Sequence, residues 1–174
     1  SDVSCDEEPP LGTMLQIHIL PECGGDTMFN NMYSAYESLS APIKDMINGL
    51  TALHSSEHFY KGRYSDRGQK DSNIICPEAI HPVVRTHDQT QNRSLYVCRA
   101  FTRQFCGWNP DESHALLDFL FEHSCRPEFQ ARHAWSKNDL IMWDNRSVMH
   151  FAVHDHEDEP RRIHRLQVEG EIPR

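Results

Sequence analysis

The sequence has few basic residues and no long apolar run. Seventeen Lys and Arg face 26 Asp and Glu among 174 residues, so the formal net charge is −9 with His neutral. General nucleic-acid binders need clustered Lys and Arg to neutralise phosphates, and this balance therefore argues against a nucleic-acid partner. No apolar run approaches the roughly 20 residues of a membrane span, so we expect no contact with a membrane.

Closely spaced cysteine pairs are also missing. The six cysteines are scattered without any C-x-x-C pair, which argues against a zinc knuckle or a thioredoxin-type redox site. A chain of this length with 38% hydrophobic residues can bury a core without disulfide bridges. We therefore expect reduced thiols in a cytoplasmic protein, folded as one domain over residues 1–174.

Short strand-like runs make up much of what is present. They alternate in polarity or are rich in β-branched and aromatic residues, and they cover residues 13–20, 81–87, 94–101, 129–135, 139–143, 148–153 and 162–168. Helices are expected over Met32–Leu39, from Ser40 to Gly49 and from Asn109 to about Phe121. The polar residues 55–75 read as a long loop. Many short strands with a few helices predict a β-sandwich or barrel rather than βαβ units.

Two residues have the chemistry of iron ligands. Asp2 offers a hard anionic oxygen and His150 a borderline nitrogen, a mixture suited to Fe(II). Two other interpretations compete. Asp2 and His150 can be a terminal charge and an ordinary strand histidine, and a zinc site can form from His150, His154 and His156 if they converge on one strand face. The charged loop around His154 and His156 favours a solvated surface for those two residues.

The last strand-like run follows a pair of arginines. Arg161, Ile163 and Arg165 point to one face of an extended chain, and Arg162 points to the other. Two arginines on a pocket-facing side would need anions to meet them. If that face is turned to solvent, they are ordinary surface charges, with Arg161 paired to Glu157 or Asp158. Strand parity alone leaves both interpretations open.

A set of motifs in the right order identifies a family. Asp2, the GGDT sequence ending at Thr27, HPVVRTH over 81–87 and the WDNR…H…RR stretch over 143–165 together resemble the taurine dioxygenase family of iron(II)/2-oxoglutarate-dependent oxygenases, which includes alkylsulfatase-type and phenoxyacetate dioxygenases. The resemblance runs from Ser1 to Arg174. It implies a mostly β fold with added helices, a double-stranded β-helix (jelly-roll, cupin-like), with the N-terminal part of the domain absent from this chain.

The resemblance also assigns roles to individual residues. Asp2 and His150 match two members of the family's catalytic His-x-Asp…His iron triad, whose first histidine would lie directly before Ser1. Thr27 and Arg161 match the residues that bind the distal carboxylate of 2-oxoglutarate, and Arg162 replaces Arg161 if the register is shifted by one.

On the substrate side, Arg165 matches an arginine that faces the substrate. Phe59 and Tyr60 match substrate-side aromatic residues, although packing of these two on the protein body is an equal alternative. Trp143 to Arg146 is expected to brace the strand that carries His150. Cys98 stands where an asparagine is usual in the family.

The implied activity is that of an iron(II)- and 2-oxoglutarate-dependent dioxygenase. It would use O2 to hydroxylate a small organic anion, a sulfonate or sulfate ester before an aryloxyalkanoate, and release succinate and CO2. The alternative is an iron-less jelly-roll module that binds a small anion without catalysis. A homo-oligomer is compatible with either function.

Overall fold

The computed structural model describes residues 2–60, 76–156 and 159–174. Its strands are β1 Gly12–Ile19, β2 Thr27–Asn31, β3 Thr51–Ser55, β4 Glu78–Pro82, β5 Val84–Thr86, β6 Arg93–Leu95, β7 Thr102–Phe105, β8 Gln130–His133, β9 Leu140–Asp144, β10 Val148–Ala152 and β11 Arg162–Val168. Its α-helices are α1 Met32–Glu37, α2 Ala41–Ile47, α3 Glu57–Tyr60 and α4 Pro110–Ser124, and a 3-10 turn covers Pro127–Phe129.

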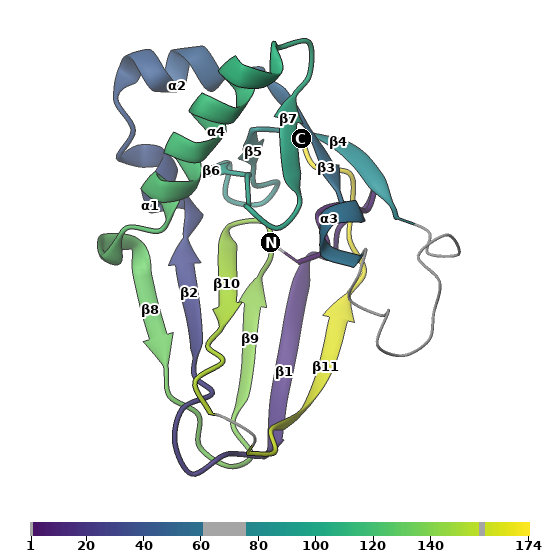
Figure 1. Ribbon diagram of the computed structural model, residues 1–174, viewed down its shortest axis with the longest axis vertical. Helices are drawn as coiled ribbons and strands as arrows, with labels where there is room; N and C mark the ends of the chain where they lie inside the picture. Colours follow the sequence, from purple (N-terminus) through teal and green to yellow (C-terminus); the bar gives the residue numbers. More distant parts are fainter. Residues whose placement is uncertain (1, 61–75, 157–158) are drawn as a thin grey trace.

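Two antiparallel sheets form the lower half of the molecule (Figure 1). One has the order β11-β1-β9 and the other β10-β2-β8. The chain thus passes from one sheet to the other between β1 and β2, between β8 and β9, between β9 and β10 and between β10 and β11, while β2 and β8 on either side of an insertion share a sheet. This crossing between two sheets is the arrangement of a double-stranded β-helix. The inner faces pack on each other, because Leu15, Ile17 and Trp143 of the first sheet share an apolar cluster with Phe29 and Val148 of the second. The predicted fold is confirmed.

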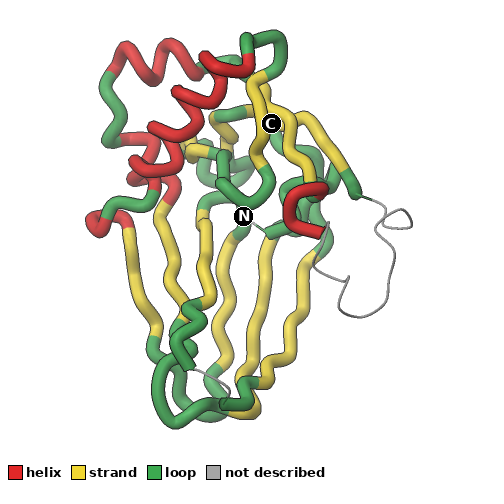
Figure 2. The backbone as a smooth tube through the Cα atoms, in the orientation of Figure 1, coloured by secondary structure: helices red, strands yellow, loops and turns green. Residues whose placement is uncertain are grey.

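A large insertion between β2 and β8 forms the other half (Figure 2). It holds α1, α2 and α4, the sheet β4-β3-β7 and the hairpin β5-β6. The carbonyl oxygen of the Asn31 side chain caps α1, and that of Asn109 caps α4, as expected for asparagine at these positions. The largest apolar cluster lies here and includes Phe105, Leu117 and Leu120.

Several predicted boundaries in the insertion are wrong. The run over 94–101 is not one strand, because β6 ends at Leu95 and the next strand begins at Thr102. Tyr96, Val97 and Cys98 lie buried in the intervening loop. Their apolar side chains give the same sequence pattern as a buried strand. The expected loop over 55–75 begins instead with the end of β3 and helix α3, and residues 61–75 lie outside the described part of the chain.

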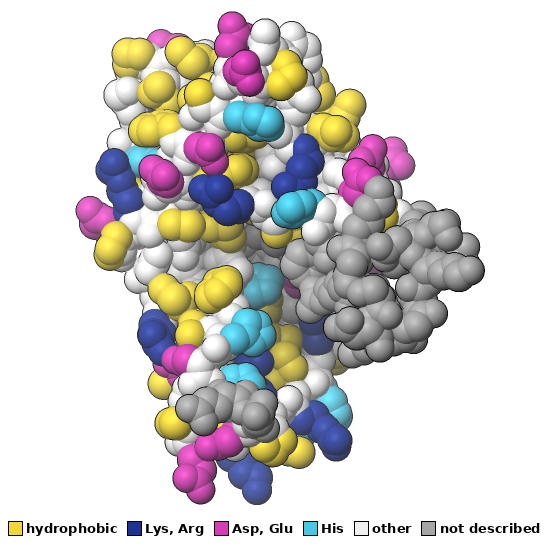
Figure 3. All heavy atoms as spheres, in the orientation of Figure 1, with side chains coloured by type: hydrophobic (Ala, Val, Ile, Leu, Met, Phe, Trp, Pro, Cys, Tyr) yellow, Lys and Arg dark blue, Asp and Glu magenta, His cyan; other side chains and the backbone are white. Residues whose placement is uncertain are grey.

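Two features of the structure concern membranes and nucleic acids. Among the described residues, no helix is both long enough and apolar enough to cross a membrane. On the face drawn in Figure 3, basic and acidic side chains are interspersed rather than gathered into a basic stripe. Such a stripe is the electrostatic footprint of nucleic-acid binding.

Candidate active site

The candidate site lies between the inner faces of the two jelly-roll sheets. His150 sits in the middle of β10, and its ring lies 4.7 Å from the ring of Trp143 on β9. Arg165 on β11 places Nη2 2.8 Å from Oδ2 of Asp2. Burial lowers the pKa of His150 to about 4, the Asp2 carboxylate opposes this shift, and the Arg165 guanidinium adds to it. Asp2, His150 and Arg165 are therefore within electrostatic reach of one another.

Asp2 is oriented by a chain of hydrogen bonds that starts at the WDNR sequence. The indole Nε1 of Trp143 donates to Oδ1 of Asn145 at 2.8 Å, and Nδ2 of Asn145 donates to Oγ1 of Thr13 at 2.8 Å. Thr13 then donates to Oδ2 of Asp2 at 2.9 Å, and Nε2 of Gln167 donates to the same oxygen at 3.3 Å. Thr13 and Asn145 are almost fully buried, so this geometry is fixed.

The environment of His150 fits a metal ligand. Its Nδ1 is buried and has no hydrogen-bond partner in the described part of the chain. The lowered pKa keeps the imidazole neutral at pH 7, which is the form that binds metals. A neutral imidazole beside a carboxylate matches the donor set of Fe(II) sites.

The zinc alternative finds no support. Within the described residues, no group of three or more His, Cys, Asp or Glu side chains is arranged to hold a metal ion. His154 is exposed, and Nδ1 of His156 lies 3.1 Å from the backbone oxygen of Glu159. His150 points into the molecule while these two residues belong to the surface, as the charged sequence around them indicated.

A second polar corner surrounds Arg161. Its Nε and Nη2 are buried without a hydrogen-bond partner among the described residues, and its guanidinium carbon lies 6.0 Å from the ring centroid of Trp135. The Nε1 of Trp135 donates to Oγ1 of Thr27 at 3.0 Å. Gly25 (φ +72°) passes so close that an added Cβ would lie 3.1 Å from Cδ of Arg161. Unpaired guanidinium N–H groups beside a hydroxyl suit a carboxylate.

The alternation of β11 decides which arginine faces inward. Ile163 packs against the inner apolar cluster and Arg165 reaches Asp2, so the face that holds Arg161 is the inner one. Arg162 is exposed on the other face. A pairing of Arg161 with Glu157 or Asp158 concerns residues outside the described ranges.

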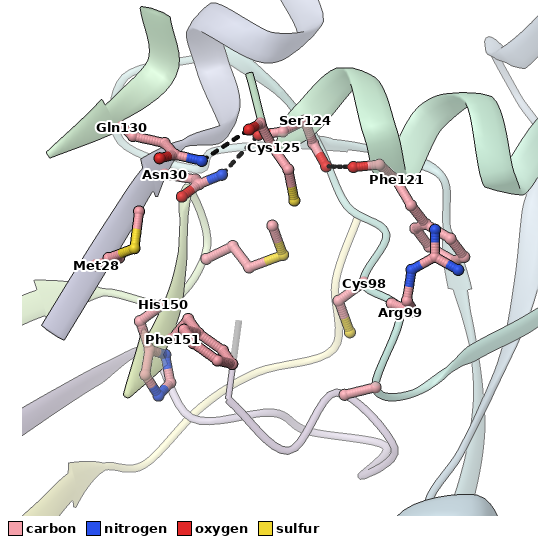
Figure 4. Close-up of a pocket in the computed structure, with 12 residues that line it drawn as sticks. Met28, Asn30, Cys98, Arg99, Phe121, Ser124, Cys125, Gln130, His150 and Phe151 are labelled. Carbon is pink, nitrogen blue, oxygen red and sulfur yellow. Dashed lines mark hydrogen bonds between the residues drawn. The ribbon is translucent and has the colours of Figure 1, made fainter. Parts of the chain in front are cut away.

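An apolar cavity of about 500 Å³ lies on the outer side of the β10-β2-β8 sheet and also borders His150 (Figure 4). Side chains from β2, β10, α4 and the loop after β6 line it, and the sulfur atoms of Met28, Cys98 and Cys125 border the open space. Cys98 thus lies on this cavity. The predicted apolar walls, Phe59 and Tyr60, belong to α3, but their side chains lie outside what the structure describes.

The comparison with known families agrees with this arrangement. The model of the taurine catabolism dioxygenase TauD, TfdA family matches residues 1–167. The chain belongs to this family. The resemblance inferred from the sequence motifs is thereby confirmed.

Individual members of the TauD, TfdA family are similar along nearly all of the chain. A Schizosaccharomyces pombe protein, provisionally named as an alpha-ketoglutarate-dependent sulfonate dioxygenase, is 37% identical over 99% of this chain and 44% of its own length. An alkylsulfatase of Acinetobacter baylyi is 35% identical over 99% of this chain and 56% of its own length. The chain therefore spans about half the length of these relatives.

A solved structure shows the same fold. The protein AAD-2, crystallised with Mn(II) and N-oxalylglycine, superposes with a TM-score of 0.85 at 29% identity, covering 99% of this chain and 68% of the other. The AAD-2 crystal thus contains a divalent metal together with N-oxalylglycine, an analogue of 2-oxoglutarate.

Proposed function

We propose that the protein is an iron(II)- and 2-oxoglutarate-dependent dioxygenase. The observation that carries this proposal is the placement of Asp2, His150 and Arg161 between the two sheets, with Nε and Nη2 of Arg161 buried and without a hydrogen-bond partner among the described residues. Asp2 and His150 would hold the iron. With 2-oxoglutarate and O2, the iron supplies the oxidising chemistry that hydroxylates a C–H bond and releases succinate and CO2.

Arg161 and Thr27 would bind the cosubstrate. The Oγ1 of Thr27 already accepts a hydrogen bond from Trp135, so its own hydrogen is available to a carboxylate. Two unpaired guanidinium N–H groups of Arg161 can donate to the same carboxylate. The Trp135 ring, which is buried beneath the guanidinium, keeps water away from this contact.

Arg165 would recognise the substrate. Its guanidinium lies beside Asp2 and is partly exposed, so an anion bound there is close to the proposed iron site. A permanently charged guanidinium selects an anionic head group, and a sulfonate or sulfate ester is favoured over an aryloxyalkanoate because of the names of the relatives above. Phe59 and Tyr60 as walls, homo-oligomerisation and a cytoplasmic location stay predictions.

Product formation tests the proposed reaction directly. The protein as its gene encodes it should form succinate from 2-oxoglutarate only with Fe(II) and O2 present, and a sulfonate or sulfate ester should stimulate this. Omission of Fe(II), omission of O2 and addition of a chelator are the controls. If no candidate substrate yields succinate and no uncoupled turnover occurs, the proposal fails and the iron-less anion-binding module takes its place.

A substrate panel tests the role of Arg165. On the wild type, sulfonates and sulfate esters should outperform neutral and cationic compounds of the same size. Arg165→Ala should lose roughly 10-fold or more in kcat/KM for the anion, because a charge-assisted hydrogen bond contributes about 1.5–3 kcal/mol. A neutral best substrate, or unchanged kinetics in Arg165→Ala, would contradict the assignment of the substrate and leave the oxygenase chemistry standing.

A further inference from the structure

Two buried histidines of the insertion lie behind the proposed metal ligand Asp2. His54 is on β3 and His81 on β4, and both are almost completely inaccessible to solvent. Ala52 pairs with His81 across the sheet and lies two residues from His54, so both imidazoles point to one face. Their rings meet edge to face with centroids 5.3 Å apart.

Both imidazoles contact the chain that follows Asp2. We call residues 2–6 the Asp2 segment. The Nδ1 of His54 lies 2.9 Å from Oγ of Ser4, and Nε2 of His81 donates to the backbone oxygen of Asp6 at 2.9 Å. Ser4 and Cys5 are completely buried between them. The insertion therefore contacts the Asp2 segment through residues that lie far from it in the sequence.

The directions of the hydrogen bonds of His54 depend on which ring nitrogen carries the proton. Burial lowers the pKa of His54 to about 3, and the neighbouring His81 adds to the shift, so the ring is neutral and has one donor and one acceptor. Oγ1 of Thr102 accepts from the backbone N–H of Cys98 at 2.9 Å and lies 3.5 Å from Nε2 of His54. If Thr102 donates to Nε2, then Nδ1–H donates to Ser4, whose hydroxyl can turn to Sγ of Cys98 at 3.7 Å.

The backbone of the Asp2 segment is strained next to Asp2. Val3 has a φ of +45°, a conformation that a β-branched residue adopts only when its surroundings impose it. The turn is closed by Asp6 N–H, which donates to the oxygen of Val3 at 3.0 Å. On the insertion, this turn is held by the hydrogen bonds with His54 and His81 and by the packing of Cys5 against Cys98 and Phe101.

From these contacts we infer that His54 is a positioning residue: through Ser4 it holds the strained Asp2 segment so that the carboxylate of Asp2 faces His150. This inference rests on the proposed function, because the position of the Asp2 carboxylate matters only if that carboxylate binds a metal. His81 supports the same segment through Asp6. Loss of the His54–Ser4 contact lets the turn at Val3 relax and moves Asp2 away from His150, so it weakens metal binding.

Titration with Co(II), which binds like Fe(II) but is stable in air, tests this role without any turnover. The visible absorption of bound Co(II) reports both affinity and coordination geometry. In the protein as its gene encodes it, His54→Leu should bind Co(II) about 10- to 100-fold more weakly, the effect typical of removing a group that orients a metal ligand. Ser4→Ala should weaken binding in the same direction. His54→Asn, which keeps a polar atom near the position of Nδ1, should restore most of the affinity.

A buried histidine elsewhere provides the matched control. His123 on α4 is nearly inaccessible, and its Nε2 lies 2.8 Å from the oxygen of Ala35 and 3.0 Å from Oγ of Ser38. His123→Leu should lower the melting temperature about as much as His54→Leu while leaving Co(II) affinity and spectrum unchanged.

The outcomes separate the two proposals. Absence of Co(II) binding by the wild type refutes the proposed function. Tight binding by the wild type with equal binding by folded His54→Leu overturns the positioning role alone. If His54→Leu does not fold, Ser4→Ala decides, and wild-type affinity in that variant overturns the role as well.

Discussion

At the scale of single residues, the site is marked by polar atoms that lack partners. Buried guanidinium and imidazole nitrogens are normally hydrogen-bonded within a protein. Nδ1 of His150 and two nitrogens of Arg161 have no such bond in the described part of the chain. Nitrogens of His18, His81, Arg85 and Arg103 lack one there as well, but His150 and Arg161 lie on the inner sheet faces, where Val148 and Ile163 belong to the apolar cluster. A buried charge without a partner lowers the stability of the folded protein. A bound ligand that accepts hydrogen bonds from Arg161 would remove this cost.

The cosubstrate pocket provides the first prediction. Arg161→Ala should raise the KM for 2-oxoglutarate about 10- to 150-fold, since a charge-assisted hydrogen bond to a partly buried carboxylate is worth about 1.5–3 kcal/mol. Thr27→Val should have a smaller effect of the same kind. Arg162→Ala is the matched control, because Arg162 is exposed on the opposite strand face. A larger effect from Arg162→Ala than from Arg161→Ala would contradict the assignment.

At the scale of elements, β1 and the WDNR turn are joined through one hydroxyl. Thr13 donates to Asp2 in a partly buried contact and accepts from Asn145 in a buried one. Thr13→Val keeps the shape of the side chain but leaves the amide of Asn145 and the carboxylate of Asp2 without this partner. We expect a loss of about 1–3 kcal/mol in the free energy of unfolding, measured by urea denaturation. Thr90→Val, at an exposed position, should change stability by less than about 0.5 kcal/mol.

Most strands of the jelly-roll were predictable from the sequence, whereas most contacts that orient the site were not. β9, β10 and β11 have strong alternation and clear flanking turns, and their predicted ranges match within two residues. β2 was missed because its residues directly follow the GGDT turn. Thr13 and His54 carry no motif, and their importance comes from partners more than ten positions away that only folding brings close. Asn145 is the exception, since it lies within WDNR.

At the scale of the whole molecule, Asp144 joins the two halves. It ends β9 in the jelly-roll, and its Oδ2 lies 3.0 Å from Nε2 of His87 in the insertion. The Nη2 of Arg146 donates to the same oxygen at 2.7 Å. Burial alone would raise the pKa of Asp144, but the hydrogen bonds from Arg146 and His87 outweigh it and lower the pKa to about 2. The ionised carboxylate is therefore a stabilising link between jelly-roll and insertion.

The pH dependence of stability follows from this shift. A carboxyl group whose pKa falls on folding from 3.8 to about 2 stabilises the folded state fully above pH 4, and this contribution, roughly 2 kcal/mol, is lost as the pH falls from 4 to 2. Asp144→Asn should thus be less stable than the wild type at pH 7 by about that amount. Other carboxylates titrate in the same range, so the measurement is the difference in unfolding free energy between wild type and variant at each pH. That difference should shrink steadily from pH 4 to pH 2, and a constant difference would show that the charge of Asp144 does not link the two halves.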